Sequence, residues 1–170
     1  MNILCTFLLF LELYLICLLI SFLYSAQVEE DFDLLDPQEP KLALLEQKLN
    51  PLFADEVSYK GTILESIMTQ QTRRRLQHEV TLSIGKKSYT LNKEDIYLCL
   101  KDENNQYYDD NMLIYVLLHE ISHSVCDEIG HTEKFHQIFQ ELTKKAVELQ
   151  IYNDKIPLIR NYCLYNDKQT

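Results

Sequence analysis

Four of the five histidines in this 170-residue chain lie within one stretch, LLHEISHSVCDEIGHTEKFH, at residues 117–136. His119 and His123 are four residues apart, a spacing that places both imidazoles on the same face of a helix. Glu120 completes the pattern HExxH, in which two histidines bind Zn²⁺ and the glutamate takes a proton from a zinc-bound water. The spacing therefore predicts hydrolytic metal chemistry, with His119 and His123 as ligands and Glu120 as general base.

A catalytic zinc site also needs a third protein ligand and an open position for water. His131 follows Gly130, where the chain has to turn between two helices. It also precedes Phe135, an apolar residue of the second helix, by four residues, so the chain can bring it back over the HExxH face. We expect His131 to be the third ligand.

Other ligand sets fit the spacing less well. His136 lies at the edge of the apolar stripe of the last helix, and Cys126 is a small residue of the kind usually buried, so both remain alternatives to His131. Glu141 is placed along the chain as in thermolysin-like sites, but helical spacing turns it towards water. The metzincin pattern HExxHxxGxxH fails because Cys126 and Ile129 occupy its glycine and third histidine positions.

Two helices are expected to position these residues. Residues 112–129 are apolar almost all round, which predicts a buried helix capped by Asp109 or Asp110 and ended by Gly130. A last helix is predicted over residues 132–150, with its apolar residues forming one stripe at positions 135, 138, 139, 142, 146 and 149.

The segment between residues 80 and 101 predicts a small sheet. It contains short runs of alternating and β-branched residues around Gly85, which favour two or three short antiparallel strands. Shorter helices are expected at residues 41–49 and 62–78. The predicted fold class is α+β, a small zincin-like domain with a short antiparallel sheet and a buried HExxH helix, preceded by an N-terminal membrane helix.

The membrane helix is predicted at residues 3–24, where Glu12 is the one charged residue. As a helix these residues span about 33 Å, enough to cross a bilayer. No Lys or Arg precedes Lys41, which disfavours a cleaved signal peptide and gives no orientation. We expect an anchor at residues 1–26, an acidic linker at 27–40, a domain at 41–170, and a single-pass membrane protein.

The charge of the chain is concentrated at its N-terminal end. Of its 26 acidic residues, seven lie in residues 1–40, which leaves residues 41–170 with 19 acidic and 16 basic residues and a net charge of −3. The one tight basic cluster is the run of arginines at 73–75, a pattern typical of a solvated helix face. Nucleic acid is therefore not an expected partner, whereas a protein or peptide substrate is.

The domain contains three of the five cysteines, at positions 99, 126 and 163. An odd and sparse set does not indicate a disulfide framework. We expect all three to be core residues, and the composition favours a reducing compartment.

The segment NMLIYVLLHEISHSVCDEIGHTEKF resembles the WLM group of SprT-like zinc metallopeptidases, in which HExxH is followed after a short gap by GHxxxF. Gly130, His131 and Phe135 fill the second half of that pattern. The resemblance continues through SYTLNKEDIYLCLKD and IYNDKIPLIRNYC and covers roughly residues 85–165.

This resemblance implies Zn²⁺ as cofactor, His119, His123 and His131 as its ligands, and Glu120 as catalytic base for peptide-bond hydrolysis. Cellular members cleave proteins, notably ones crosslinked to DNA, and shorter versions occur in large DNA viruses. The expected function is thus a membrane-anchored zinc metallopeptidase. The alternatives are a catalytically silent zinc-binding interaction module and a DNA-associated protease. An oxyanion donor is also expected, and the tyrosines available for it are Tyr152 and Tyr162.

Overall fold

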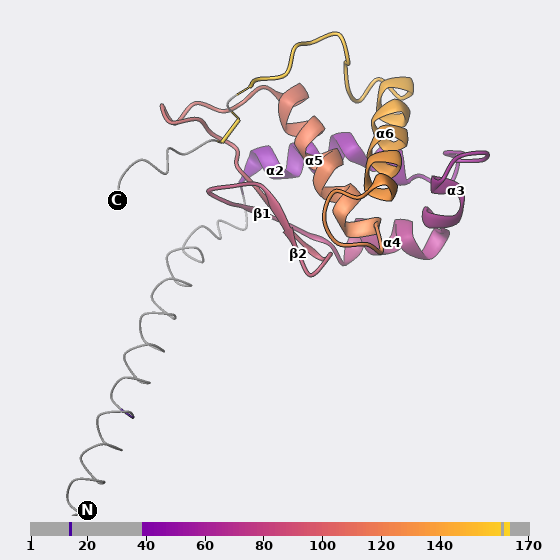
Figure 1. Ribbon diagram of the computed structural model, residues 1–170. Helices are drawn as coiled ribbons and strands as arrows, with labels where there is room; N and C mark the ends of the chain where they lie inside the picture. Colours follow the sequence, from indigo (N-terminus) through magenta and orange to yellow (C-terminus); the bar gives the residue numbers. More distant parts are fainter. Residues whose placement is uncertain (1–13, 15–38, 161, 164–170) are drawn as a thin grey trace, which may run out of the picture. The chain divides into compact units, whose positions relative to one another are not determined.

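A computed structural model describes residues 14, 39–160 and 162–163 of the chain. The chain divides into a unit of residues 1–35 and a unit of residues 36–170. The second unit is an α+β domain, as predicted. Its elements are α2 (Pro40–Leu49), η1 (Asn50–Phe53), α3 (Leu64–Ile67), α4 (Gln70–His78), β1 (Thr81–Ile84), β2 (Tyr89–Leu91), β3 (Asp95–Leu98), α5 (Asp110–Val125) and α6 (Glu133–Glu148) (Figure 1).

Within the described residues, no helix combines the length and the apolar character needed to cross a bilayer. The longest helices of the described part, α5 and α6, have 16 residues each, or about 24 Å against a hydrocarbon core of about 30 Å. The predicted span at residues 3–24 and the linker at 27–40 lie outside the described residues, apart from Tyr14 and positions 39–40. Because no described helix could cross a bilayer, the predictions of an N-terminal membrane helix and of a single-pass membrane location are corrected.

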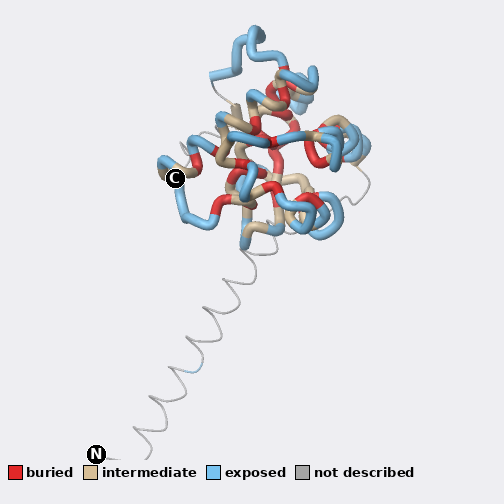
Figure 2. Tube along the Cα trace, turned by 90° about the vertical axis from the view of Figure 1, so that its right-hand side faces the viewer, coloured by how far each residue is buried: buried red, intermediate tan, exposed pale blue. Residues whose placement is uncertain are grey.

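The α5 helix is the central element of the domain. Asp109 caps it by accepting a hydrogen bond from the backbone N–H of Met112 at 3.0 Å, so the cap is Asp109 rather than Asp110. Ten of the 16 residues of α5 are buried, because α2, α6, β2 and β3 all pack against it. Figure 2 shows the buried residues running through the interior of the domain. A helix enclosed in this way holds the side chains of its HExxH pattern in fixed positions.

The end of α5 comes four residues before its predicted end. Cys126 leaves the helical conformation with ψ at 128°. Two basic side chains then bind carbonyl groups at the helix end: Arg75 donates to the Ser124 oxygen at 2.9 Å, and the Lys93 ammonium donates to the Cys126 oxygen. Because helix-terminal carbonyl groups need such partners, these contacts stabilise the end of α5 at this position, before the loop that leads to α6.

The sheet is mixed rather than antiparallel, which corrects the prediction. Its strand order is β1-β3-β2, with β1 parallel and β2 antiparallel to β3. A tight turn at Asn92 and Lys93, both with positive φ, joins β2 to β3, while the chain from β1 to β2 crosses the end of β3. Gly85 lies at this crossing, where a Cβ atom would be 2.5 Å from the Lys87 oxygen and 2.9 Å from the Tyr97 Cβ. Position 85 therefore requires glycine.

The run of three arginines in α4 is mostly structural, not a solvated face. Arg73 is 9% exposed, and its guanidinium group donates to three backbone oxygens, those of Ala54, Val57 and Met68. Arg75 joins the β2–β3 turn to the end of α5 by donating to the oxygens of Lys93 and Ser124. Arg74 is the exposed member of the run.

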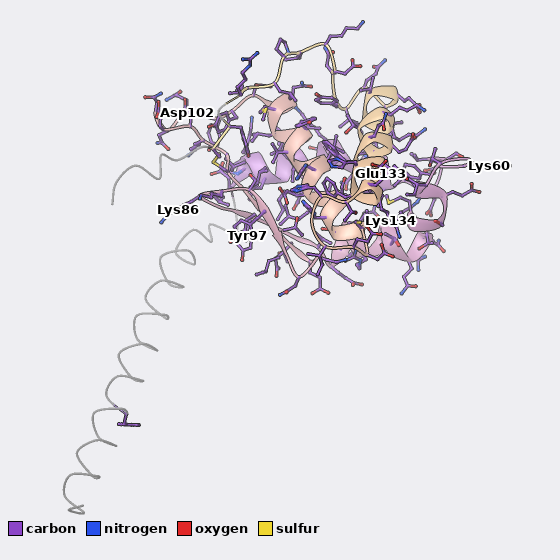
Figure 3. All side chains as sticks on the ribbon, in the orientation of Figure 1. Lys60, Lys86, Tyr97, Asp102, Glu133 and Lys134 are labelled. Atoms are coloured by element: carbon purple, nitrogen blue, oxygen red, sulfur yellow. A yellow bond between two sulfur atoms is a disulfide. The ribbon has the colours of Figure 1, made fainter. Side chains whose placement is uncertain are left out.

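Cys99 and Cys163 form a disulfide between Cα atoms 6.2 Å apart (Figure 3), so the expectation of three unpaired core cysteines is wrong. Of the described cysteines, Cys126 alone is free and buried. The pair forms because the chain after α6 returns to the end of β3. There the Tyr162 hydroxyl donates to the Cys99 oxygen at 2.6 Å, and the Cys163 N–H donates to the Tyr108 hydroxyl at 3.1 Å.

Removing this disulfide is expected to lower the free energy of unfolding by about 4 kcal/mol, because the bond closes a loop across a sequence separation of 64 residues. Thermal denaturation of the wild type with and without dithiothreitol measures the effect. The Cys163→Ser variant serves as control, since dithiothreitol should not lower its melting temperature further. Equal melting temperatures for oxidised and reduced wild type would contradict the prediction.

Candidate metal centre

Three histidines from two parts of the chain meet at one point. His119 and His123 lie one turn apart on α5 and are half-buried, and the exposed His131 lies in the loop before α6. The Nε2 atom of His131 is 2.9 Å from that of His119 and 3.2 Å from that of His123. The three ligand atoms lie within 4.8 Å of one another. The structure thus brings together the residues that the sequence singled out as metal ligands.

The loop that carries His131 is held at both ends. Gly130 turns the chain with φ at +84°, a conformation that glycine adopts without steric cost. Asp127 then pairs with Lys134 at 2.7 Å, and Thr132 caps α6. Lys134 is labelled in Figure 3, at the first turn of α6. These contacts bring the loop back over α5 and fix where His131 lies.

One buried aromatic ring contacts all three imidazoles. Phe135, in the first turn of α6, is 0% exposed. Its ring centroid is 4.9 Å from that of His119, 4.3 Å from that of His123 and 4.8 Å from that of His131. The His123 ring stacks on it and the other two meet it edge-on. The sequence predicted Phe135 as part of the apolar stripe of the last helix and of the GHxxxF pattern. The structure adds that its ring packs against all three imidazoles and so restrains them.

The environment of the two half-buried imidazoles favours their neutral form. Burial, and then the charges of the neighbouring histidines, lower the pKa of His119 to about 4. Burial, followed by the charges of His131 and Lys93, lowers the pKa of His123. Neutral imidazole is the form that binds a metal ion, so both side chains are ready to ligate at neutral pH.

The geometry of the cluster fits one zinc ion. With Zn–N bonds of 2.0–2.1 Å, two ligand nitrogens of a tetrahedral site lie about 3.3 Å apart, and the two contacts given above are close to that spacing at 2.9 and 3.2 Å. In the described part of the chain the cluster consists of these three histidines. Three nitrogen ligands with an exposed side match a catalytic zinc site, which keeps one position open, better than a closed structural site.

Glu120, the residue after His119 on α5, is buried and its side chain is held by a strand residue. It is 4% exposed, and its Oε2 atom accepts a hydrogen bond from the Thr90 hydroxyl of β2 at 2.8 Å. Burial raises the pKa of the Glu120 carboxyl group, and the Thr90 hydrogen bond opposes that shift. A buried carboxylate is a stronger base than an exposed one and is suited to proton transfer. No motif or residue spacing in the sequence indicates that Thr90 belongs to the site.

The alternative ligands are not brought into the cluster. His136 is exposed, with its ring centroid 6.4 Å from that of His131. Cys126 is 1% exposed and forms the C-cap of α5. Glu141 lies 3.9 Å from the Lys144 ammonium, on α6. The two candidate oxyanion donors, Tyr152 and Tyr162, also lie outside the cluster of three histidines.

The Tyr162 hydroxyl is already engaged, because it donates to the Cys99 oxygen and lies 2.8 Å from the Ser88 hydroxyl. Tyr152 is 6% exposed and packs its ring against Tyr115, with centroids 5.8 Å apart. Among the described contacts, neither tyrosine has a hydrogen bond or ring contact with the three imidazoles. The oxyanion donor stays unassigned.

Comparison with known proteins finds relatives of this chain among viral proteins. The uncharacterized protein 136R of Invertebrate iridescent virus 6 is 42% identical over 122 residues, which cover 70% of this chain and 68% of the viral protein. The chain belongs to the 136R family. No protein-family model and no solved structure matches it, so the resemblance to the WLM group stays a prediction.

Two further viral proteins match shorter parts of this member of the 136R family. The uncharacterized protein 042R of Invertebrate iridescent virus 3 is 46% identical over 77 residues, which cover 45% of this chain and 48% of that protein. The uncharacterized protein R325 of Acanthamoeba polyphaga mimivirus is 43% identical over 67 residues, which cover 38% of this chain and 34% of that protein. The chain therefore spans half or less of the length of these two relatives.

Proposed function

We propose that the protein is a zinc-dependent peptidase in which His119, His123 and His131 hold the ion and Glu120 is the general base. The observation that carries this proposal is the convergence of three imidazole Nε2 atoms, two of them from the helix α5 that also carries the buried carboxyl group of Glu120. The resemblance of residues 111–135 to the WLM group of SprT-like metallopeptidases supports the same assignment. The expected substrate is a protein or peptide.

A zinc ion held there would supply Lewis-acid activation of a water molecule and of the scissile carbonyl group. Glu120 accepts the proton of the attacking water and later donates it to the leaving amine. Its Oε2 atom accepts the Thr90 hydrogen bond, which leaves Oε1 for the transfer. Phe135 keeps the three imidazoles in a common orientation through its ring contacts.

A catalytically silent zinc-binding module explains less of the site. Binding of an ion by three histidines does not require Glu120, yet this carboxyl group is buried at 4% exposure, at a cost in folding free energy that a silent module has no reason to bear. A DNA-associated protease receives no support from the arginine run, because Arg73 and Arg75 donate to backbone oxygens. A peptidase is the function that uses every group in the site.

The proposal is tested by metal removal. Purified protein is expected to bind one zinc ion per chain and to cleave members of a peptide library, with products identified by mass spectrometry. Dialysis against 1,10-phenanthroline should abolish cleavage, and one equivalent of zinc should restore it. Zinc binding without cleavage of any peptide would favour the silent module instead.

A further inference from the structure

Thr90 occupies a distinctive place in the sheet, in the middle of the outer strand β2 and opposite Ile96 of β3. Its neighbours Tyr89 and Leu91 are 40% and 45% exposed, whereas Ile96 is 2% exposed. Because side chains alternate between the faces of a strand, Thr90 shares the inner face with Ile96. This face packs against α5, the helix that carries the HExxH pattern.

The Thr90 hydroxyl contacts Glu120 at two points. Its Oγ1 atom is 2.8 Å from the carboxyl oxygen Oε2 and 3.0 Å from the backbone oxygen of the same residue. A hydroxyl has one proton, and an ionised carboxylate can only accept. The proton therefore goes to Oε2 whenever Glu120 is charged, in the stronger of the two possible hydrogen bonds.

The Glu120 carboxyl group accepts a hydrogen bond from the Thr90 hydroxyl through Oε2. A glutamate side chain rotates about three bonds, so a single contact at its end decides where its second oxygen points. The hydrogen bond fixes Oε2 from the side of the sheet, and among the hydrogen bonds of residues 39–160 and 162–163 none is donated to Oε1. Small displacements of a reacting group are costly, since an error of about 1 Å lowers a rate by about 100-fold.

We propose that Thr90 is a positioning residue for Glu120, holding Oε2 so that Oε1 is presented to the water that is activated at the three histidines. The kinetic consequence rests on the proposed peptidase function, whereas the positioning itself does not. Thr90 acts through Glu120 and has no contact with the reacting atoms. The sheet thus contributes to the site a residue that lies outside both the HExxH and the GHxxxF patterns.

The test compares Thr90→Val, which removes the hydroxyl but keeps a β-branched side chain suited to a strand, with Thr90→Ser, which keeps the hydroxyl. A matched control is Thr81→Val on β1, where the lost hydroxyl donates to Asp95 at 2.6 Å. Thr90→Val should retain one zinc ion per chain and an unchanged KM, with kcat reduced about 10- to 100-fold. Thr90→Ser should recover most of kcat, and Thr81→Val should match the wild type.

A second readout does not depend on activity. In crystal structures of the zinc-loaded proteins, Glu120 should keep its hydrogen bond to residue 90 in the wild type and in Thr90→Ser. In Thr90→Val the carboxyl group should turn to another rotamer or divide between several. An unmoved Glu120 in Thr90→Val would overturn the inference, even if the wild type proved to have no peptidase activity. Equal kcat values for Thr90→Val and wild type, or a Thr90→Ser as impaired as Thr90→Val, would also overturn it.

Discussion

Replacing Glu120 by glutamine is expected to leave one zinc ion per chain and to lower the rate of peptide cleavage by about 10²- to 10⁴-fold, the contribution typical of a general base. Glutamine has the same shape as glutamate, and its carbonyl oxygen can accept the Thr90 hydrogen bond that Oε2 accepts in the wild type. It cannot take a proton from water. The three imidazoles are untouched, so the variant separates metal binding from chemistry.

The measurement is the initial rate of cleavage at saturating substrate, with zinc content determined on the same samples. Glu141→Gln is the matched control, because Glu141 is a carboxylate on α6 that lies near Lys144 and outside the histidine cluster. That control should cleave at the wild-type rate. Cleavage by Glu120→Gln at the rate of the control would contradict the assigned mechanism.

Replacing His131 by alanine is expected to weaken zinc binding by more than about 100-fold, since loss of groups that merely orient ligands already costs 10- to 100-fold. His131 supplies one of the three converging nitrogens, at 2.9 and 3.2 Å from the other two. It is exposed in a loop, so its removal leaves the buried core intact. Competition titration against a chromophoric chelator measures the affinity, and circular dichroism checks the fold.

His136→Ala is the control for this variant. His136 is also an exposed histidine, five residues further along the chain, and its ring centroid lies 6.4 Å from that of His131. Its removal should leave the zinc affinity unchanged. Equal affinities for the two variants would refute His131 as the third ligand.

Local patterns in the sequence predicted the helices around the site. The apolar stripe of the last helix places Phe135, Ile138, Leu142 and Ala146 in the core, and all four are 0% exposed. The spacing of HExxH and the position of His131 after Gly130 predicted which three histidines would meet. Such predictions succeed because helical periodicity and turn residues act over a few neighbouring positions.

Features that join distant segments could not be predicted in this way. The parallel pairing of β1 with β3 depends on where the chain crosses the sheet, and the Cys99–Cys163 disulfide on where the chain after α6 returns. Arg73 was expected on a solvated face, but its side chain is buried, and the backbone oxygens that accept its hydrogen bonds belong to residues up to 19 positions away. Thr90 meets Glu120 across 30 positions. Spacing along the chain carries no signal for contacts of this kind.

The measurement that tests the metal centre most directly is zinc K-edge X-ray absorption on the purified protein with one equivalent of zinc. Three imidazole nitrogens at about 2.0–2.1 Å and one further light ligand are expected. His119→Ala, His123→Ala and His131→Ala should each remove part of the imidazole signal. A sulfur shell at about 2.3 Å, or a protein that retains no zinc, would contradict a centre built from these three histidines.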